Sequence, residues 1–317
     1  MEIKRSEIMP GVNLSYLWSD KFKTSCLSLT MLTQLQRDTA SMNALIPLVL
    51  RRGTTRDPDM ESLSARLDEL YGTAIEPVVR RIGEIQCLGF YASIPESEYL
   101  PGHEDVLGAA AELLGELLLF PATRGGLLLP QYVDSEREKA EDMIKSRVND
   151  KRSYSLTRCI EEMCCYEDFA VGRLGSLDDM RSVNYKKLTK QYRALLQTAP
   201  IEIFYCGKAP KKRLVSALRD ALSTLPRGEI DYDIGTDVRM NSVEEQPRYV
   251  EEELEVTQGK LVIGWRLGEC MDEPDYPALY VFNAVFGSGA ASKLFVNVRE
   301  RLSLCYYASS LLDLHKG

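Results

Sequence analysis

Apolar and polar residues alternate in several short segments of the chain, which predicts β-strands. The segments VNLSYLWS (12–19) and TSCLSLTML (24–32) both follow a period of two. Segments 74–83 and 84–95 follow each other closely and predict a hairpin. The apolar segment IEIFYCG (201–207) predicts a buried strand.

Between these segments, apolar residues recur with the helical period. A helix is expected over 39–52, kinked or loosened near Pro47 because proline cannot donate a backbone hydrogen bond. In the segment 57–72, DPDMESLSARLDELYG, Asp57 is the expected N-cap and Gly72 ends the helix. Further helical patterns occur at 103–119, 130–168, 184–198 and 211–225.

A polar segment rich in turn-forming residues separates this series from a second one. In the second series, two strands are expected first, at 251–256 and 259–267. Two helices follow, at 274–286 and 291–301, and then a third strand at 304–312. This order predicts an α+β fold of two related half-domains, each an antiparallel sheet with helices packed on one face. The predicted domains are 1–225, a linker at 226–249, and the start of a second half-domain at 250–317.

Composition narrows the possible partners. Apolar residues make up 44% of the 317 residues, and the formal net charge is −8. An acidic chain of this kind argues against nucleic acid as a partner. The N-terminus shows no secretory pattern, and the most apolar segment is interrupted by Glu112 and Glu116, so neither secretion nor a membrane is expected. The eight cysteines then predict reduced, mostly buried thiols in the cytoplasm.

Three segments carry a resemblance to a known family. They are LRRGTTRDPDMESLSARLDELYG (50–72), VDSEREKAEDMI (133–144) and FGSGAASKLFVNVRERLSLCYY (286–307). The chain resembles the pitrilysin and insulinase-like metallopeptidases, the group that includes the mitochondrial processing peptidase. Segments around 149–164 and 257–267 are similar to its zinc-free partner chains. The resemblance implies a clamshell of such halves around a peptide, with the second half of this chain incomplete at its C-terminus.

The zinc motif of this family has no counterpart in the chain. Aligned on Gly53-Thr54, the H-x-x-E-H ligand and base positions fall on Ala44, Pro47 and Leu48, which can neither bind zinc nor activate water. Glu136 matches the third-ligand position, although a solvated helix charge is the plainer interpretation. The two histidines, His103 and His315, are not placed to rebuild a site. No metal and no cofactor are expected.

The segment 286–307 also contains an arginine and a tyrosine that match a second feature of the family. By resemblance, Arg299 and Tyr306 are the pair that helps to hold the substrate carbonyl from the half opposite the zinc. The alternative is an exposed arginine and a tyrosine that fills a core edge. Gly287 and Gly289 match a turn along the peptide chamber.

These features predict a non-catalytic subunit of a heterodimeric zinc peptidase. It would pair with a zinc-bearing H-x-x-E-H chain, or with itself if none exists, complete the peptide chamber and supply Arg299 and Tyr306 in trans. Peptide would bind by adding a strand to a sheet edge. The alternative is a peptide-binding or structural scaffold protein with no proteolytic partner.

Overall fold

The computed structural model describes residues 3–237, 246–267 and 274–316. The chain divides into two compact units, one formed by Met1–Tyr154 and Cys164–Gly235 and the other by Ser155–Met163 and Thr236–Gly317. The middle of the predicted linker, 238–245, lies outside the described residues.

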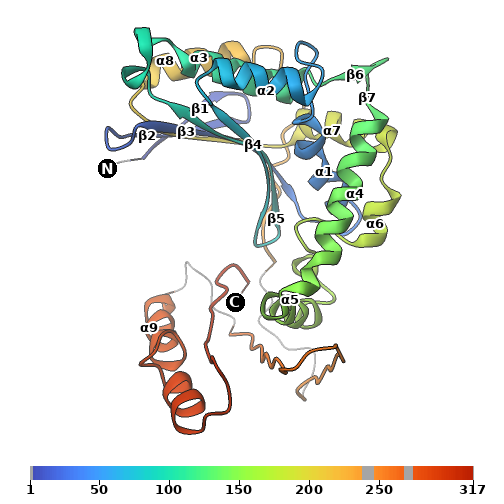
Figure 1. The fold of residues 1–317 in the computed structure, drawn as a ribbon, viewed down its shortest axis with the longest axis vertical. Helices are drawn as coiled ribbons and strands as arrows, with labels where there is room; N and C mark the ends of the chain where they lie inside the picture. The colour runs from blue at the N-terminus through green and yellow to red at the C-terminus, as the bar shows by residue number, and fades with distance from the viewer. Residues whose placement is uncertain (1–2, 238–245, 268–273, 317) are drawn as a thin grey trace. The chain divides into compact units, whose positions relative to one another are not determined.

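A six-stranded sheet forms the framework of the first unit (Figure 1). The strand order is β1-β2-β8-β3-β5-β4. The strands are β1 (Lys4–Met9), β2 (Val12–Trp18), β3 (Thr24–Gln34), β4 (Ala74–Ile82), β5 (Ile85–Pro95) and β8 (Ile201–Gly207). The hairpin predicted over 74–95 is present, because β4 and β5 pair antiparallel.

The alternation in the sequence decides which face of the sheet is covered. Leu27, Leu29 and Met31 on β3 are buried in the core, whereas the residues between them are only half-buried. The same pattern holds on β8, so helices cover one face, as predicted. One pairing differs from the predicted antiparallel sheet: β2 and β8 run parallel. Parallel neighbours need a long crossover, and nearly the whole unit lies between these two strands.

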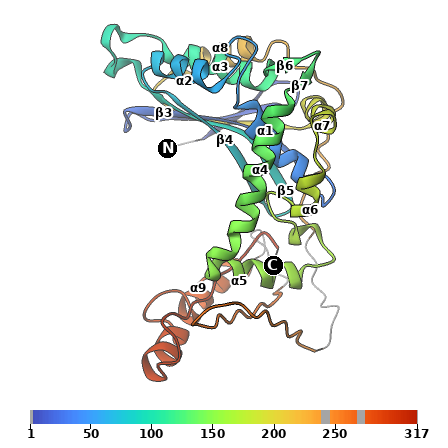
Figure 2. The ribbon, with the colours of Figure 1, turned by 45° about the vertical axis from the view of Figure 1, so that its right-hand side comes forward.

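Helices of the first unit gather on the covered face in two groups. In both views α2 and α3 lie beside α8, while α1, α4, α6 and α7 form a second group (Figure 2). The packing of α3 with α8, and of α1 with α4 and α7, closes the core. The helices are α1 (Ala40–Leu50), α2 (Met60–Glu69), α3 (Val106–Leu119), α4 (Pro130–Ser146), α6 (Leu177–Ser182), α7 (Tyr185–Thr198) and α8 (Lys211–Ala221).

Two small features complete the first unit. A two-stranded ribbon joins β6 (Thr123–Arg124) to β7 (Leu127–Leu128). Beyond α8, the Arg227 side chain donates hydrogen bonds to the carbonyls of Leu196 and Ala199, both at 2.9 Å. This contact holds the chain that follows α8 against the C-terminal end of α7.

The second unit is built from helices and irregular segments. Helix α5 (Lys151–Met163) belongs to it from Ser155 onward, and its Arg158 pairs with Glu252 at 2.5 Å. Helix α9 (Tyr276–Phe286) and a π-helix (Phe295–Arg301) occupy the two predicted helical regions. The strands predicted at 251–256, 259–267 and 304–312 are not formed in the part of the chain that the structure describes. A strand needs a second strand to pair with, and no strand pairing involves these segments in the described residues.

Within the described ranges, no helix is both long and apolar enough to cross a membrane.

Candidate functional site

Helix α1 carries the positions at which the family places its zinc motif. The helix runs unbroken from Ala40 to Leu50, so the predicted loosening at Pro47 is not observed. Ala44 and Pro47 are buried in the core, and the half-buried Leu48 packs against it. These side chains fill space between α1 and its neighbours. They offer no metal ligand and no general base.

Glu136, at the third-ligand position, lies on α4 next to the end of α1. Its side chain is 10% exposed, so the prediction of a solvated helix charge is wrong. The Arg52 Nη1 donates to Glu136 Oε1 at 3.1 Å, and the Lys139 Nζ donates to the same oxygen at 2.8 Å. The Arg52 guanidinium also lies over the Tyr132 ring, 5.2 Å from its centroid.

The carboxylate of Glu136 therefore has two cationic partners from the chain itself. No group of three or more histidine, cysteine, aspartate or glutamate side chains suited to a metal occurs among the described residues. His103 is exposed at the end of a short 3-10 helix (Pro101–His103), and His315 is exposed near the C-terminus. The negative charge of Glu136, at the position of the family's third zinc ligand, is thus balanced by Arg52.

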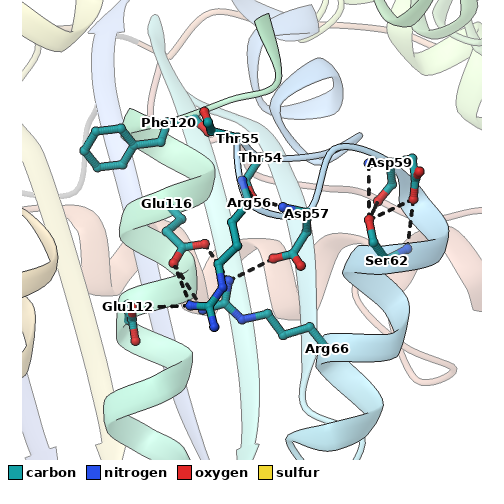
Figure 3. A network of polar contacts seen from close by, with 10 residues as sticks. All are labelled: Thr54, Thr55, Arg56, Asp57, Asp59, Ser62, Arg66, Glu112, Glu116 and Phe120. Carbon is teal, nitrogen blue, oxygen red and sulfur yellow. Dashed lines mark hydrogen bonds and ion pairs between the residues drawn. The ribbon is translucent and has the colours of Figure 1, made fainter.

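The loop that follows α1 is fastened by a network that the sequence pattern did not indicate (Figure 3). Thr54 Oγ1 accepts hydrogen bonds from the backbone N–H groups of Arg56 and Asp57, at 3.2 and 2.9 Å. The Thr55 backbone N–H donates to the Phe120 carbonyl at 2.8 Å. The Ala122 N–H donates to the Gly53 carbonyl at 3.0 Å, so the Gly-Thr pair shared with the family ties the end of α1 to the segment after α3.

Arg66 of α2 is the centre of this network. Its Nη1 donates to Glu116 Oε2 on α3 at 2.5 Å and to Asp57 Oδ2 at 2.8 Å. Burial alone would lower the pKa of the Arg66 guanidinium, but the hydrogen bonds from Glu116 and Asp57 outweigh it and raise the pKa. Asp57 is therefore not the N-cap of α2. Asp59 caps the helix, in a reciprocal capping box with Ser62.

The edge strand β4 is closed along part of its free side. The Arg51 Nε donates to the Ile75 carbonyl at 2.6 Å, and the Arg173 Nη1 donates to the Val79 carbonyl at 3.3 Å. Pro77 has no N–H to offer between them. A strand that added here would have to displace both arginines, so the structure disfavours addition of a peptide strand at β4; β1 is the other edge strand of the sheet.

Arg299 and Tyr306 lie in the second unit. Arg299 is in the π-helix, with its guanidinium paired with Glu300 and 5.1 Å from the centroid of the Phe295 ring. Tyr306 follows in an irregular segment and is 80% exposed, so it does not fill a core edge among the described residues. Gly287 ends α9, and its carbonyl accepts the Ser310 N–H at 3.1 Å. Gly289 has a φ of +103°, which few other residues adopt.

Comparison with known proteins identifies the family to which the chain belongs. The model of a family described as the peptidase M16 inactive domain matches residues 182–317. YmfF of Bacillus subtilis, described as a probable inactive metalloprotease, is 35% identical over 97% of this chain and 71% of its own length. The chain therefore belongs to the peptidase M16 family, the pitrilysin and insulinase-like group.

Solved structures agree with this assignment. A conserved protein from Enterococcus faecalis V583 aligns with a TM-score of 0.85 at 27% identity, covering 99% of this chain and 73% of that one. A peptidase M16 inactive domain from Pseudomonas fluorescens aligns with a TM-score of 0.71 at 14% identity, covering 98% and 70%. The second likeness shows the fold alone. With aliphatic residues at the motif positions, this chain is an inactive member of the family and not a peptidase by itself.

Proposed function

We propose that this chain is the non-catalytic subunit of a heterodimeric M16 peptidase in the cytoplasm. A zinc-bearing H-x-x-E-H chain would supply the metal and the general base. This chain would complete the peptide chamber, with the turn at Gly287 and Gly289 along its wall, and would offer Arg299 and Tyr306 to the substrate in trans.

The observation that carries the proposal is that the chain lacks the zinc motif but has the arginine and tyrosine of the opposite half. The motif positions on α1 are aliphatic, whereas the arginine and tyrosine of the opposite half are both present. Tyr306 is largely exposed, so its hydroxyl is accessible to a peptide. A guanidinium and a phenol are donors suited to a carbonyl oxygen that gains negative charge in the transition state.

The state of β4 limits where a peptide can add a strand. Two arginines occupy carbonyls on its free side, so extended peptide would pair with β1, the other edge of this sheet, or with an edge strand of the zinc-bearing chain. In the absence of a zinc-bearing partner, the same surface would be expected to support a homodimer.

The test is hydrolysis of a peptide library by this chain alone, by a zinc-bearing relative alone and by the mixture, with bound zinc assayed in each. We expect activity only in the mixture. Arg299→Ala should lower its kcat/KM by about 100-fold, as loss of an oxyanion donor does elsewhere. Tyr306→Phe should lower it by about tenfold, the effect of one hydrogen bond.

Neighbouring residues provide matched controls. Arg301→Ala and Tyr307→Phe remove the same groups two positions and one position away, and should change kcat/KM by less than about twofold. Equal effects at both pairs would contradict the assigned roles. Zinc or cleavage in the lone chain would overturn the proposal, and inactivity of every mixture would favour a scaffold protein with no proteolytic partner.

A further inference from the structure

Two cysteines face each other across the middle of the first unit's sheet. Cys26 of β3 pairs in register with Cys206 of β8, which is its neighbour in the antiparallel ladder. Both cysteines are free and half-buried. The sequence predicts mostly buried thiols, but of the seven described cysteines only Cys87 and Cys164 are buried.

Burial along the strands places both thiols on one face. Leu27 and Tyr205, the next pair in the ladder, have their side chains in the core. Side chains alternate along a strand, and directly opposite residues share a face. Cys26 and Cys206 therefore project together from the face that the helices leave uncovered.

The hydrogen-bond pattern fixes the spacing of their backbones. The Leu32 N–H donates to the Pro200 carbonyl at 2.8 Å in the same register. Hydrogen-bonded pairs alternate along an antiparallel ladder, and Cys26 lies an even number of positions from Leu32. The two cysteines thus form a hydrogen-bonded pair, whose Cα atoms are about 5.5 Å apart in such ladders. That Cα separation lies in the range of disulfides, but the Cβ atoms of a hydrogen-bonded pair are farther apart than in most disulfides, so the bond would form with some local adjustment and be easily reduced.

We propose that Cys26 and Cys206 are a reversible thiol–disulfide site, oxidised by a low-molecular-weight disulfide. One thiolate of the pair attacks the small disulfide, forms a mixed disulfide and releases one small thiol. The second thiolate then attacks the protein sulfur of that mixed disulfide and releases the other small thiol. The cysteine pair loses two electrons and two protons, and the small disulfide is reduced to two thiols.

The local environment affects the rate of this exchange through the pKa of the attacking thiol. Burial raises the pKa of the Cys26 thiol, so the reaction is faster at mildly alkaline pH, where more of the thiol is ionised. Once formed, the bond joins two central strands that are remote in sequence. A cross-link of this kind restricts the unfolded chain strongly, so oxidation should raise the Tm by several degrees.

The test uses the native protein with oxidised glutathione as the probe. After alkylation of the remaining thiols, trypsin releases Cys26 in peptide 24–37 and Cys206 in peptide 194–208, each with no other cysteine. We expect mass spectrometry to find these two peptides joined in a monomeric protein, and to find them separate after reduction.

Single-cysteine variants distinguish a built pair from two reactive thiols. Cys26→Ser and Cys206→Ser should each abolish the link and the gain in Tm, leaving a glutathione adduct on the remaining cysteine. Cys87→Ser, on the neighbouring strand β5, should retain both. Separate glutathione adducts on the two cysteines of the unaltered protein, a link between two molecules, or no reaction at either thiol would overturn the proposal. None of these results depends on the proposed peptidase partner.

Discussion

The contact between Arg52 and Glu136 shows how one residue can keep a buried carboxylate after a metal site is lost. Glu136 is 10% exposed, and Arg52 is 25% exposed. A carboxylate in this position needs a positive partner, because burial of an unpaired charge is costly. The guanidinium supplies that charge from within the chain. It also leaves the Arg52 Nε buried without a hydrogen-bond partner in the described structure, so the contact is incomplete.

Glu136→Gln tests this contact. The amide keeps the shape of the side chain but leaves the partly buried Arg52 charge unbalanced. We expect the free energy of unfolding, measured by urea denaturation, to fall by about 2 kcal/mol. Glu138→Gln is the matched control on the same helix, because Glu138 is exposed, and it should change stability by less than about 0.5 kcal/mol. Equal values for the two variants would show that Glu136 contributes no more than a surface charge.

At the scale of elements, Arg66 connects α2 to α3 and to the loop after α1. Its side chain is 12% exposed, and its partners Asp57 and Glu116 are 13% and 15% exposed. Three charged groups in such a setting depend on one another, because removal of the arginine leaves two carboxylates with little access to water. Arg56 approaches the same Glu116 at 3.7 Å but is 64% exposed (Figure 3).

The two arginines therefore form a natural comparison. We expect Arg66→Ala to lower the free energy of unfolding by about 3 kcal/mol, because it removes a partly buried ion pair. Arg56→Ala should lower it by less than about 0.5 kcal/mol, as is usual for exposed pairs. Thermal or urea denaturation of both variants provides the measurement. A larger loss for Arg56→Ala would mean that solvent exposure does not rank these pairs.

Elements of the first unit were predictable from the sequence because local pattern and tertiary burial agree there. The alternation of Leu27, Leu29 and Met31 specified both a strand and its buried face. The second unit differs, since segments 251–256, 259–267 and 304–312 have the composition expected of strands but form no strands in the described structure. Pattern alone shows that a segment can join a sheet. It does not supply the neighbouring strand.

The candidate site divides in the same way. The absence of the zinc motif at Ala44, Pro47 and Leu48 could be predicted from the sequence, because residue identity alone excludes a metal ligand. The partner of Glu136 could not be predicted from the sequence. Arg52 is 84 positions away and reaches Glu136 only because α1 packs on α4. The closure of β4 by Arg51 and Arg173 depends on tertiary structure for the same reason.

At the scale of the whole molecule, apolar side chains are exposed in large numbers in the second unit. Leu261 is 86% exposed, Leu304 is 73% exposed and Trp265 is 64% exposed. Large exposed apolar side chains are typical of surfaces that another protein covers. In the proposed heterodimer, we expect the zinc-bearing chain to cover part of this unit.

The two tryptophans of the chain allow this expectation to be measured by fluorescence. Trp18 ends β2 in the first unit and is 52% exposed, and Trp265 lies in the second unit. Trp18→Phe leaves Trp265 as the single reporter, and Trp265→Phe leaves Trp18. With a partner chain whose own tryptophans have been replaced, we expect mixing to shift the emission of the Trp18→Phe protein to shorter wavelength, because the indole leaves water. The Trp265→Phe protein should change little. A shift only in the Trp265→Phe protein would assign the contact to the first unit instead.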